Sequence, residues 1–169
     1  ESSAASDVYK RQLPRFGMRI ELTQPYDNFS YYGRGPQENY IDRCSGSFIG
    51  CYDDKVENQY SEYIRPQETG NKTDVRWLTL LDSDGAGIKI TGLQPIAFSA
   101  LHFTPEDLDP GLTRKMQHTI DVIPQKNVFL HVDMKQRGLG GDSSWGMYPH
   151  TEYRLLDKKY SYSYILELE

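Results

Sequence analysis

The sequence predicts an all-β, sandwich-like domain with one short helix. Thirteen tyrosines, six phenylalanines and two tryptophans supply aromatic side chains, which suit pleated sheets. Fourteen glycines and nine prolines punctuate the chain, and both residue types interrupt helices and favour turns. Several short runs alternate apolar and polar residues with the period of two that a half-buried strand requires. A chain of 169 residues is long enough for one domain with a sizeable core.

Apolar runs separated by turn signals predict the strands in order. They are expected at residues 18–22, 29–32, 75–81, 88–91, 96–103, 128–134 and 160–169. In the first, Met18, Ile20 and Leu22 alternate with polar residues, and a turn at 27–28 precedes the second. The run Asp-Ser-Asp-Gly-Ala-Gly at 82–87 predicts the hairpin turn between the third and the fourth.

Two later strands carry distinct faces, and one helix has clear end signals. In the run 128–134 the even-numbered residues form an apolar face, with His131 and Asp133 on the other. In the last run, tyrosines and leucines at even positions alternate with serines and glutamates. Thr104 offers an N-cap before Pro105 and two acids, and Asp-Pro-Gly at 109–111 ends the helix after one or two turns.

Composition argues against several classes of function. The net charge of −5 and a pI of about 5.4 disfavour binding to nucleic acid, which needs clustered Lys and Arg. No apolar run approaches the roughly 20 residues of a membrane helix. Cys44 and Cys51 lack a metal-binding pattern; two free, buried thiols are expected, with a bridge across a turn as the alternative. Four scattered histidines are expected to be structural; they are His102, His118, His131 and His150.

The first twelve residues differ from the rest of the chain. They are small and polar, then basic, without periodicity, so residues 1–12 are expected to form a tail outside the domain at 13–169. No apolar segment of a signal peptide is visible. The sequence therefore does not report its compartment, and both the cytoplasm and the periplasm stay open.

The glycine-rich run Gly138-Leu-Gly-Gly-Asp-Ser-Ser-Trp-Gly146 is the most informative motif. Its glycines predict a tightly turning loop after the strand that ends near residue 135. A large flat ring at Trp145 on such a loop suits a platform that faces a ligand. From these residues alone the structural alternative is favoured, in which Trp145 caps the end of a β core while Asp142 and Ser143 satisfy turn amides.

Two polar loops at residues 31–43 and 63–77 are dense in hydrogen-bonding groups. Each contains Pro-Gln-Glu shortly after an arginine. Arg, Glu, Asn and aromatic residues on loops are typical of a carbohydrate site, but buried, salt-bridged clamps under long loops are favoured for each residue taken singly. The residues concerned are Arg34, Glu38, Arg43, Arg65, Glu68, Asp74 and Arg76. No pair of carboxyl groups at glycosidase spacing can be singled out, and no phosphate, dinucleotide or hydrolase motif is present.

Four runs together resemble one family. Leu13-Pro-Arg-Phe-Gly17, Y-Y-G-R-G-P-Q-E-N-Y-I-D-R, R-P-Q-E-T-G-N-K-T-D-V-R-W and G-L-G-G-D-S-S-W-G occur in this order. They resemble the C-terminal small-chain domain of the large β-galactosidases of glycoside hydrolase family two, from about Leu13 to the end of the chain. The resemblance implies a β-supersandwich similar to galactose mutarotases, here truncated at its start.

The resemblance also implies an activity that this chain shares in without performing it alone. The whole enzyme would hydrolyse terminal β-galactosides such as lactose with retention. Its catalytic glutamates would lie in a separate barrel domain, so no catalytic residue is assigned here. Magnesium and sodium would belong to those other domains, with no metal or cofactor in this chain. Expected partners are the β-galactoside and the remaining domains of a homo-oligomeric enzyme, without nucleic acid or membrane.

One residue role carries over from the family. The Trp of the G-G-D-x-S-W motif matches Trp145, which is therefore expected to stack on the aglycone half of the substrate. Residues supporting that loop would be Gly140, Gly141, Asp142 and Ser144. Two alternatives remain open: a free-standing galactoside-binding module, and a mutarotase-like epimerase that pairs a carboxylate with His102, His118 or His131. A truncated supersandwich should also expose an apolar face, making the isolated chain marginally stable or self-associating.

Overall fold

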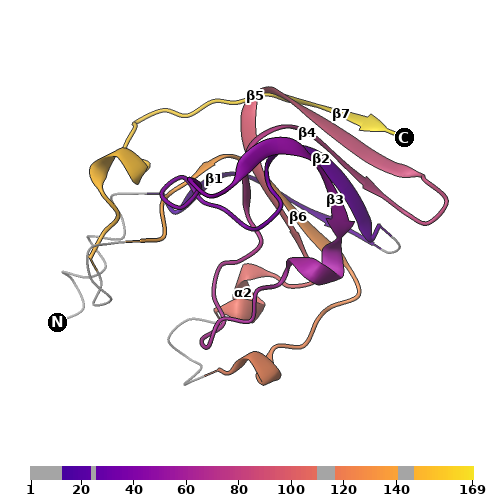
Figure 1. The fold of residues 1–169 in the computed structure, drawn as a ribbon, viewed down its shortest axis with the longest axis horizontal. Helices are drawn as coiled ribbons and strands as arrows, with labels where there is room; N and C mark the ends of the chain where they lie inside the picture. Colours follow the sequence, from indigo (N-terminus) through magenta and orange to yellow (C-terminus); the bar gives the residue numbers. More distant parts are fainter. Residues whose placement is uncertain (1–12, 24–25, 110–116, 141–146) are drawn as a thin grey trace.

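The structure, a computed structural model, describes residues 13–23, 26–109, 117–140 and 147–169. The expected tail at 1–12 lies outside these residues. The strands are β1 (Arg15–Leu22), β2 (Asn28–Gly35), β3 (Phe48–Lys55), β4 (Lys72–Leu81), β5 (Gly87–Leu101), β6 (Val128–Gln136) and β7 (Tyr164–Leu168). Short helical turns are α2 (Pro105–Leu108), η1 (Val56–Gln59), η3 (Thr119–Asp121) and η4 (Thr151–Tyr153). The all-β prediction is confirmed (Figure 1).

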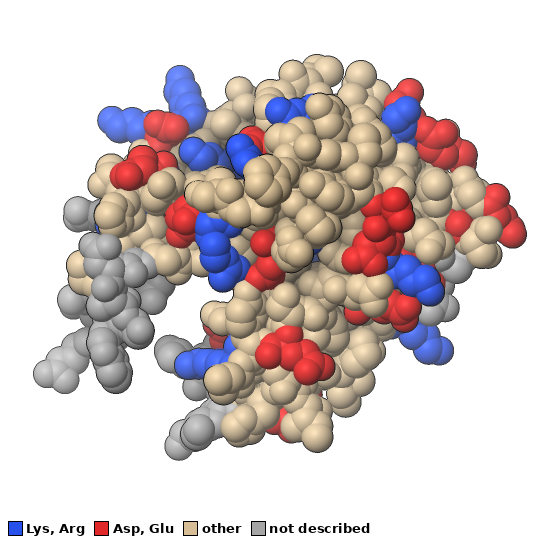
Figure 2. Space-filling model, viewed as in Figure 1, with Lys and Arg blue, Asp and Glu red and all other residues tan. Residues whose placement is uncertain are grey.

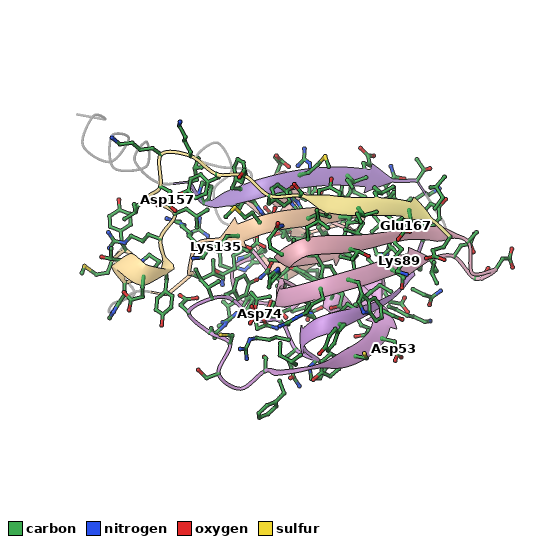
Figure 3. The ribbon with its side chains drawn as sticks, turned by 90° about the horizontal axis from the view of Figure 1, so that it is seen from above. Asp53, Asp74, Lys89, Lys135, Asp157 and Glu167 are labelled. Carbon is green, nitrogen blue, oxygen red and sulfur yellow. The ribbon has the colours of Figure 1, made fainter. Side chains whose placement is uncertain are left out.

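All seven strands join one antiparallel sheet in the order β1-β6-β5-β4-β2-β3, with β7 pairing to β5. Along β5, residues 88–92 pair with β7 and residues 97–101 pair with β6. The strand β4 pairs with both parts of β5 along one edge. The strands β6 and β7 therefore lie end to end along the other edge of β5. Figure 3 shows the strands side by side, with Lys89 of β5 and its partner Glu167 of β7 labelled.

A bulge bends the two longest strands. Trp77 pairs with Thr91, whereas Val75 pairs with Ile96, so β5 carries extra residues at 92–95. Asp74 on β4 adopts a φ of 53°, an uncommon backbone conformation for a residue other than glycine. Bulges increase the local twist and bend a strand. The two strands predicted at 88–91 and 96–103 are therefore one bent strand.

The main core lies on one face of this bent sheet. It is built from alternate residues of the central strands, including Phe29, Tyr31, Leu78, Phe98 and Leu130, each no more than 2% exposed. The opposite face of β5 and β6 is buried too, because the loop at 56–71 and α2 cover it. Tyr60 of this loop stacks on Phe103 at 4.6 Å, and Leu108 of α2 joins the same small cluster.

The second face of β6 is buried as well as the first. Phe129, His131 and Asp133, predicted to face away from Leu130 and Val132, are 4%, 7% and 1% exposed. The short helix that covers this area is confirmed, with its predicted cap. Thr104 Oγ1 accepts a hydrogen bond from the Asp107 backbone at 3.1 Å, and Asp107 Oδ2 accepts one from the Thr104 backbone at 2.8 Å.

Other elements differ from the sequence prediction at their edges. The strand β3 was not predicted, and β2 extends through Gly35 into a segment expected to be loop. The last strand is shorter than predicted: Tyr160 and Tyr162 precede β7 and pack on Phe16, with ring centroids 5.3 and 5.9 Å away. Both cysteines are free, as predicted, but Cys51 is exposed and Cys44 partly exposed, so the prediction that they are buried was wrong.

Apolar side chains are exposed at the open end of the core face. Leu166 and Leu168 pair with the buried Ile90 and Ile88, yet they are 47% and 85% exposed. Met18 of β1 is 43% exposed and accepts a contact from the Tyr164 hydroxyl at 3.6 Å. Among the helices that the structure describes, none is long and apolar enough to cross a membrane.

Candidate functional site

Two loops are joined into one clamp at the end of the sheet. The loop 36–47 follows β2, and the loop 60–71 precedes β4. The Asn39 backbone donates to the Asn71 carbonyl at 2.7 Å, and Asn71 Nδ2 donates to the Asn39 carbonyl at 2.8 Å. Asn39 Oδ1 also accepts the Thr73 backbone N–H at 2.9 Å. Both asparagines are fully buried, so these bonds fix the two loops relative to each other.

The Glu38 carboxylate is the centre of this clamp. It accepts hydrogen bonds from Arg43 Nη2 at 2.7 Å, the Gly70 backbone at 2.7 Å and Thr69 Oγ1 at 3.1 Å. The hydroxyls of Tyr63 and Tyr40 donate to the same group. Burial and the bond to Glu38 raise the pKa of Tyr63, so its hydroxyl stays protonated and donating. Glu38 is thus an organising acceptor with little capacity for another partner.

A second polar cluster lies under the same loop. Arg15 of β1 contacts Asp133 Oδ2 through Nη2 at 2.5 Å and Nε at 2.9 Å, and it contacts Glu68 at 3.4 Å. Burial raises the pKa of Asp133 and of Glu68, while the charge of Arg15 acts against both shifts. Gly17 lies against Asp133, where an added Cβ would overlap the carboxylate and the neighbouring backbone. The two Pro-Gln-Glu triplets therefore place their glutamates in two separate clusters.

A buried lysine lies beneath the clamp. Lys72 is 2% exposed, and its Nζ donates to Gln59 Oε1 at 2.8 Å and to the Gly70 carbonyl at 3.4 Å. Burial lowers the pKa of Lys72 to about 8, with Glu38 and Asp54 opposing that shift. The lysine ties η1 to the end of the loop 60–71, and so supports the clamp from below.

Five of the seven predicted loop residues form ion pairs, but not all of these pairs are buried as predicted, since the side chains of Asp74 and Arg43 are 42% and 54% exposed. Arg34 pairs with Asp74 at 2.5 Å, Arg43 pairs with Glu38, and Glu68 pairs with Arg15. Asp74 lies beside the loops in Figure 3, and its carbonyl accepts a bond from Arg76. Arg76 also lies over the ring of Tyr32, 5.5 Å from its centroid. Arg76 therefore has no ion pair to a described residue, and neither does Arg65, which is exposed.

The glycine-rich loop begins against this clamp. Gly138 donates to the Tyr153 carbonyl at 2.8 Å, and Gly140 donates to Asp42 Oδ2 at 2.7 Å. A Cβ at Gly138 would come within 2.5 Å of the same Asp42 oxygen, so a larger residue there would force the Asp42 side chain to move. Gly140, one of the four residues predicted to support the loop, is held by this hydrogen bond to Asp42. Trp145 and the other three, Gly141, Asp142 and Ser144, fall outside the described residues.

A cavity of about 320 Å³ lies between the loop stem and the clamp. Its lining residues are Asp42, Arg43, Tyr63, Gln67, Glu68, Leu139 and Gly140. Sequence reasoning missed Asp42, because its partner Gly140 is 98 residues away and no local pattern connects them. On the face seen in Figure 2, acidic and basic residues are interspersed over the surface.

The histidines fall into different surroundings. His131 is buried, and burial together with Arg15 and Arg19 lowers its pKa to about 3, so it is neutral at pH 7. His102 lines a separate cavity of about 490 Å³, where its Nε2 lies 3.9 Å from Asp27 Oδ1. His118 is exposed at the start of η3. Within the described ranges, no group of three or more His, Cys, Asp or Glu side chains is arranged to hold a metal.

Comparison with known proteins identifies close similarity over most of the chain. The family model for the beta galactosidase small chain matches residues 2–166, which includes most of the expected tail. A beta-galactosidase of Priestia megaterium is 35% identical over 168 residues, covering 99% of this chain and 16% of the relative. A beta-galactosidase of Halalkalibacterium halodurans is 36% identical over 145 residues, covering 85% of this chain and 14% of the relative. A beta-galactosidase of Streptococcus thermophilus is 32% identical over 157 residues, covering 92% of this chain and 15% of the relative. The chain thus spans about one sixth of the length of these relatives.

Proposed function

The chain belongs to the beta-galactosidase small chain family, and from this premise we propose that it supplies a non-catalytic wall on the aglycone side of a β-galactosidase active site. In this proposal the intact enzyme hydrolyses terminal β-galactosides such as lactose with retention. Trp145 stacks on the aglycone, while Gly140, Gly141, Asp142 and Ser144 hold its loop. The observation that carries the proposal is the anchoring of the loop stem by Asp42 beside a cavity.

The engagement of the nearby carboxylates supports a non-catalytic role. A retaining glycosidase needs two available carboxyl groups roughly 5 Å apart. At this site Glu38 is surrounded by donors, and Glu68 lies against Arg15. These two carboxylates are engaged in holding the loops, and the third carboxylate of the site, Asp42, accepts the Gly140 backbone N–H at one of its oxygens. The catalytic carboxylates, and the magnesium and sodium expected of the intact enzyme, are therefore assigned to other parts of that enzyme.

Exposed apolar residues around the cavity support contact with those other parts. Ile64, next to Tyr63 of the lining, is 95% exposed, and Leu139 of the loop stem is 44% exposed. Covering a fully exposed isoleucine gains about 1.5–3 kcal/mol. We assign this rim to interdomain contact within a homo-oligomeric enzyme, so that the cavity opens toward the substrate between domains.

The Trp145→Ala substitution in the intact enzyme tests this role. An aromatic stacking contact is worth about 1 kcal/mol, so KM for lactose should rise about fivefold while kcat stays within twofold. Transfer of galactose to sugar acceptors should weaken in parallel. Trp145→Phe keeps an aromatic ring, so its KM should rise less than that of Trp145→Ala. Trp77→Phe is the matched control, because Trp77 lines a different cavity beside Lys89. Unchanged KM in Trp145→Ala would refute the assignment.

A free-standing galactoside-binding module would use the same cavity. The two roles differ in what the chain does in isolation. Titration of the isolated chain with lactose in a calorimeter should give no heat if Trp145 needs the rest of the enzyme to form a site. Saturable heat would favour the binding module.

A further inference from the structure

We propose that the wall continues past Arg43 into a second saccharide-binding cavity, which takes the additional sugar unit of a longer aglycone. This inference rests on the proposed function, because it extends the same site. The substrate class it implies is a galactoside whose aglycone is itself a disaccharide, such as a galactosyl-lactose trisaccharide.

The second cavity is adjacent to the first. It has a volume of about 590 Å³, and it shares Asp42, Arg43 and Tyr63 with the 320 Å³ cavity at the loop stem. Its remaining lining residues are Gln37, Glu38, Cys44, Ser45, Gly46 and Ser47. Both volumes lie within the range of about 300–1,000 Å³ that is typical of small-molecule sites. A ligand that fills the first cavity and extends over Arg43 would therefore enter the second.

Arg43 is oriented to serve both cavities. Its Nη2 donates to Glu38 Oε1 at 2.7 Å and to the Tyr63 hydroxyl at 3.1 Å, and its guanidinium lies 5.0 Å from the centre of the Tyr40 ring. The side chain is nevertheless 54% exposed. Within the described part of the chain, its Nε and Nη1 donate no hydrogen bond. These N–H groups form a fixed donor set that can reach ligand hydroxyls on either side.

The charges around the second cavity disfavour an anionic ligand, since Asp42 has no ion pair to any described residue. Glu38 neutralises Arg43 directly and is occupied by its other donors. Asp42 is occupied at one oxygen by Gly140. The other groups available are the hydroxyls of Ser45 and Ser47 and the amide of Gln37, which donate and accept without charge. An anionic ligand would find no uncompensated cation among these residues, whereas a sugar would find matched donors and acceptors.

Gly46→Trp tests the second cavity without removing any side chain from the first. A Cβ at Gly46 has no atom within 4 Å, and its φ is not positive, so the backbone accepts a side chain at this lining position, and we expect an indole there to narrow the cavity. The variant is made in the intact enzyme and assayed on lactose and on galactosyl-lactose. We expect kcat/KM for lactose within twofold of wild type and a loss of at least fivefold for the trisaccharide. Ser83→Trp, on the exposed turn of the β4–β5 hairpin, is the matched control.

The outcomes separate the two proposals. A selective loss on the trisaccharide supports the second cavity, whereas an equal effect on both substrates, or none, overturns it. Trp145→Ala, assayed on the same pair, tests the wall itself. If it raises KM for both substrates while Gly46→Trp does not discriminate between them, the wall stands and the second cavity fails. If Trp145→Ala leaves both KM values unchanged, the proposed function fails.

Discussion

Glu38→Ala is expected to lower the unfolding free energy of the chain by about 4 kcal/mol. The substitution leaves several donors of the clamp without their acceptor. Gly70 is buried and Thr69 is fully buried, so neither regains a bond to water without opening the loop. The ion pair with Arg43 contributes less, because that side chain is half exposed. Most of the loss therefore comes from the buried neutral donors.

Urea unfolding of the chain measures this loss. With a slope of about 2 kcal/mol per molar urea, the midpoint should fall by about 2 M. Glu62→Ala is the matched control, because Glu62 is an exposed glutamate on the same loop, and it should change stability by less than about 0.5 kcal/mol. If Glu38→Ala stays within about 1 kcal/mol of wild type, the clamp is not organised by this carboxylate.

Arg15→Met is expected to lower stability by about 3 kcal/mol at pH 7, because it leaves Asp133 buried without its partner. Asp133 is 1% exposed, and burial already raises its pKa. A carboxyl group whose folded-state pKa lies above the unfolded value destabilises the fold increasingly as pH rises through that range. The deficit of the variant relative to wild type should therefore shrink as pH falls, since protonation neutralises Asp133.

Unfolding at pH 7 and pH 5 tests both parts of this expectation. Comparison with wild type at each pH is essential, because the buried His131, with its pKa lowered to about 3, destabilises both proteins as pH falls below 6.5. Arg15→Met with Asp133→Asn should recover part of the loss, and Arg65→Met, at an exposed arginine, should have little effect. A deficit that grows on acidification would contradict the buried-charge explanation.

Much of the fold is predictable because alternation records which face of a strand is buried. The hairpin of β4 and β5 follows from its Asp-Gly turn and its apolar runs. The bulge at 92–95 was misread as a break, since Gly92 and Pro95 interrupt the pattern, although a bulge tolerates both residues. The edge strand β3 gave no signal, because Phe48 is 74% exposed and polar residues do not alternate around it.

The site was only partly predictable, because it depends on contacts between segments that are far apart in the sequence. Loop composition indicated ion-paired clamps, and these exist. Which acid organises them depends on contacts between Glu38 and residues 25–32 positions away, which no local period records. Burial of His131 and Asp133 likewise depends on a covering loop and α2, which the alternation along their own strand does not record. The anchoring of Gly140 by Asp42 joins segments that only the folded sheet brings together.

The most direct test of the central claim is hydrolysis of o-nitrophenyl β-galactoside by the purified chain, alone and mixed with the rest of the enzyme as a second polypeptide. The account predicts no activity from the chain alone and activity after mixing, because the chain would complete a site whose catalytic carboxylates lie elsewhere. Trp145→Ala in the mixed enzyme should then weaken substrate binding. Robust hydrolysis by the chain alone would contradict the account, since it would require a catalytic pair of carboxylates within these 169 residues.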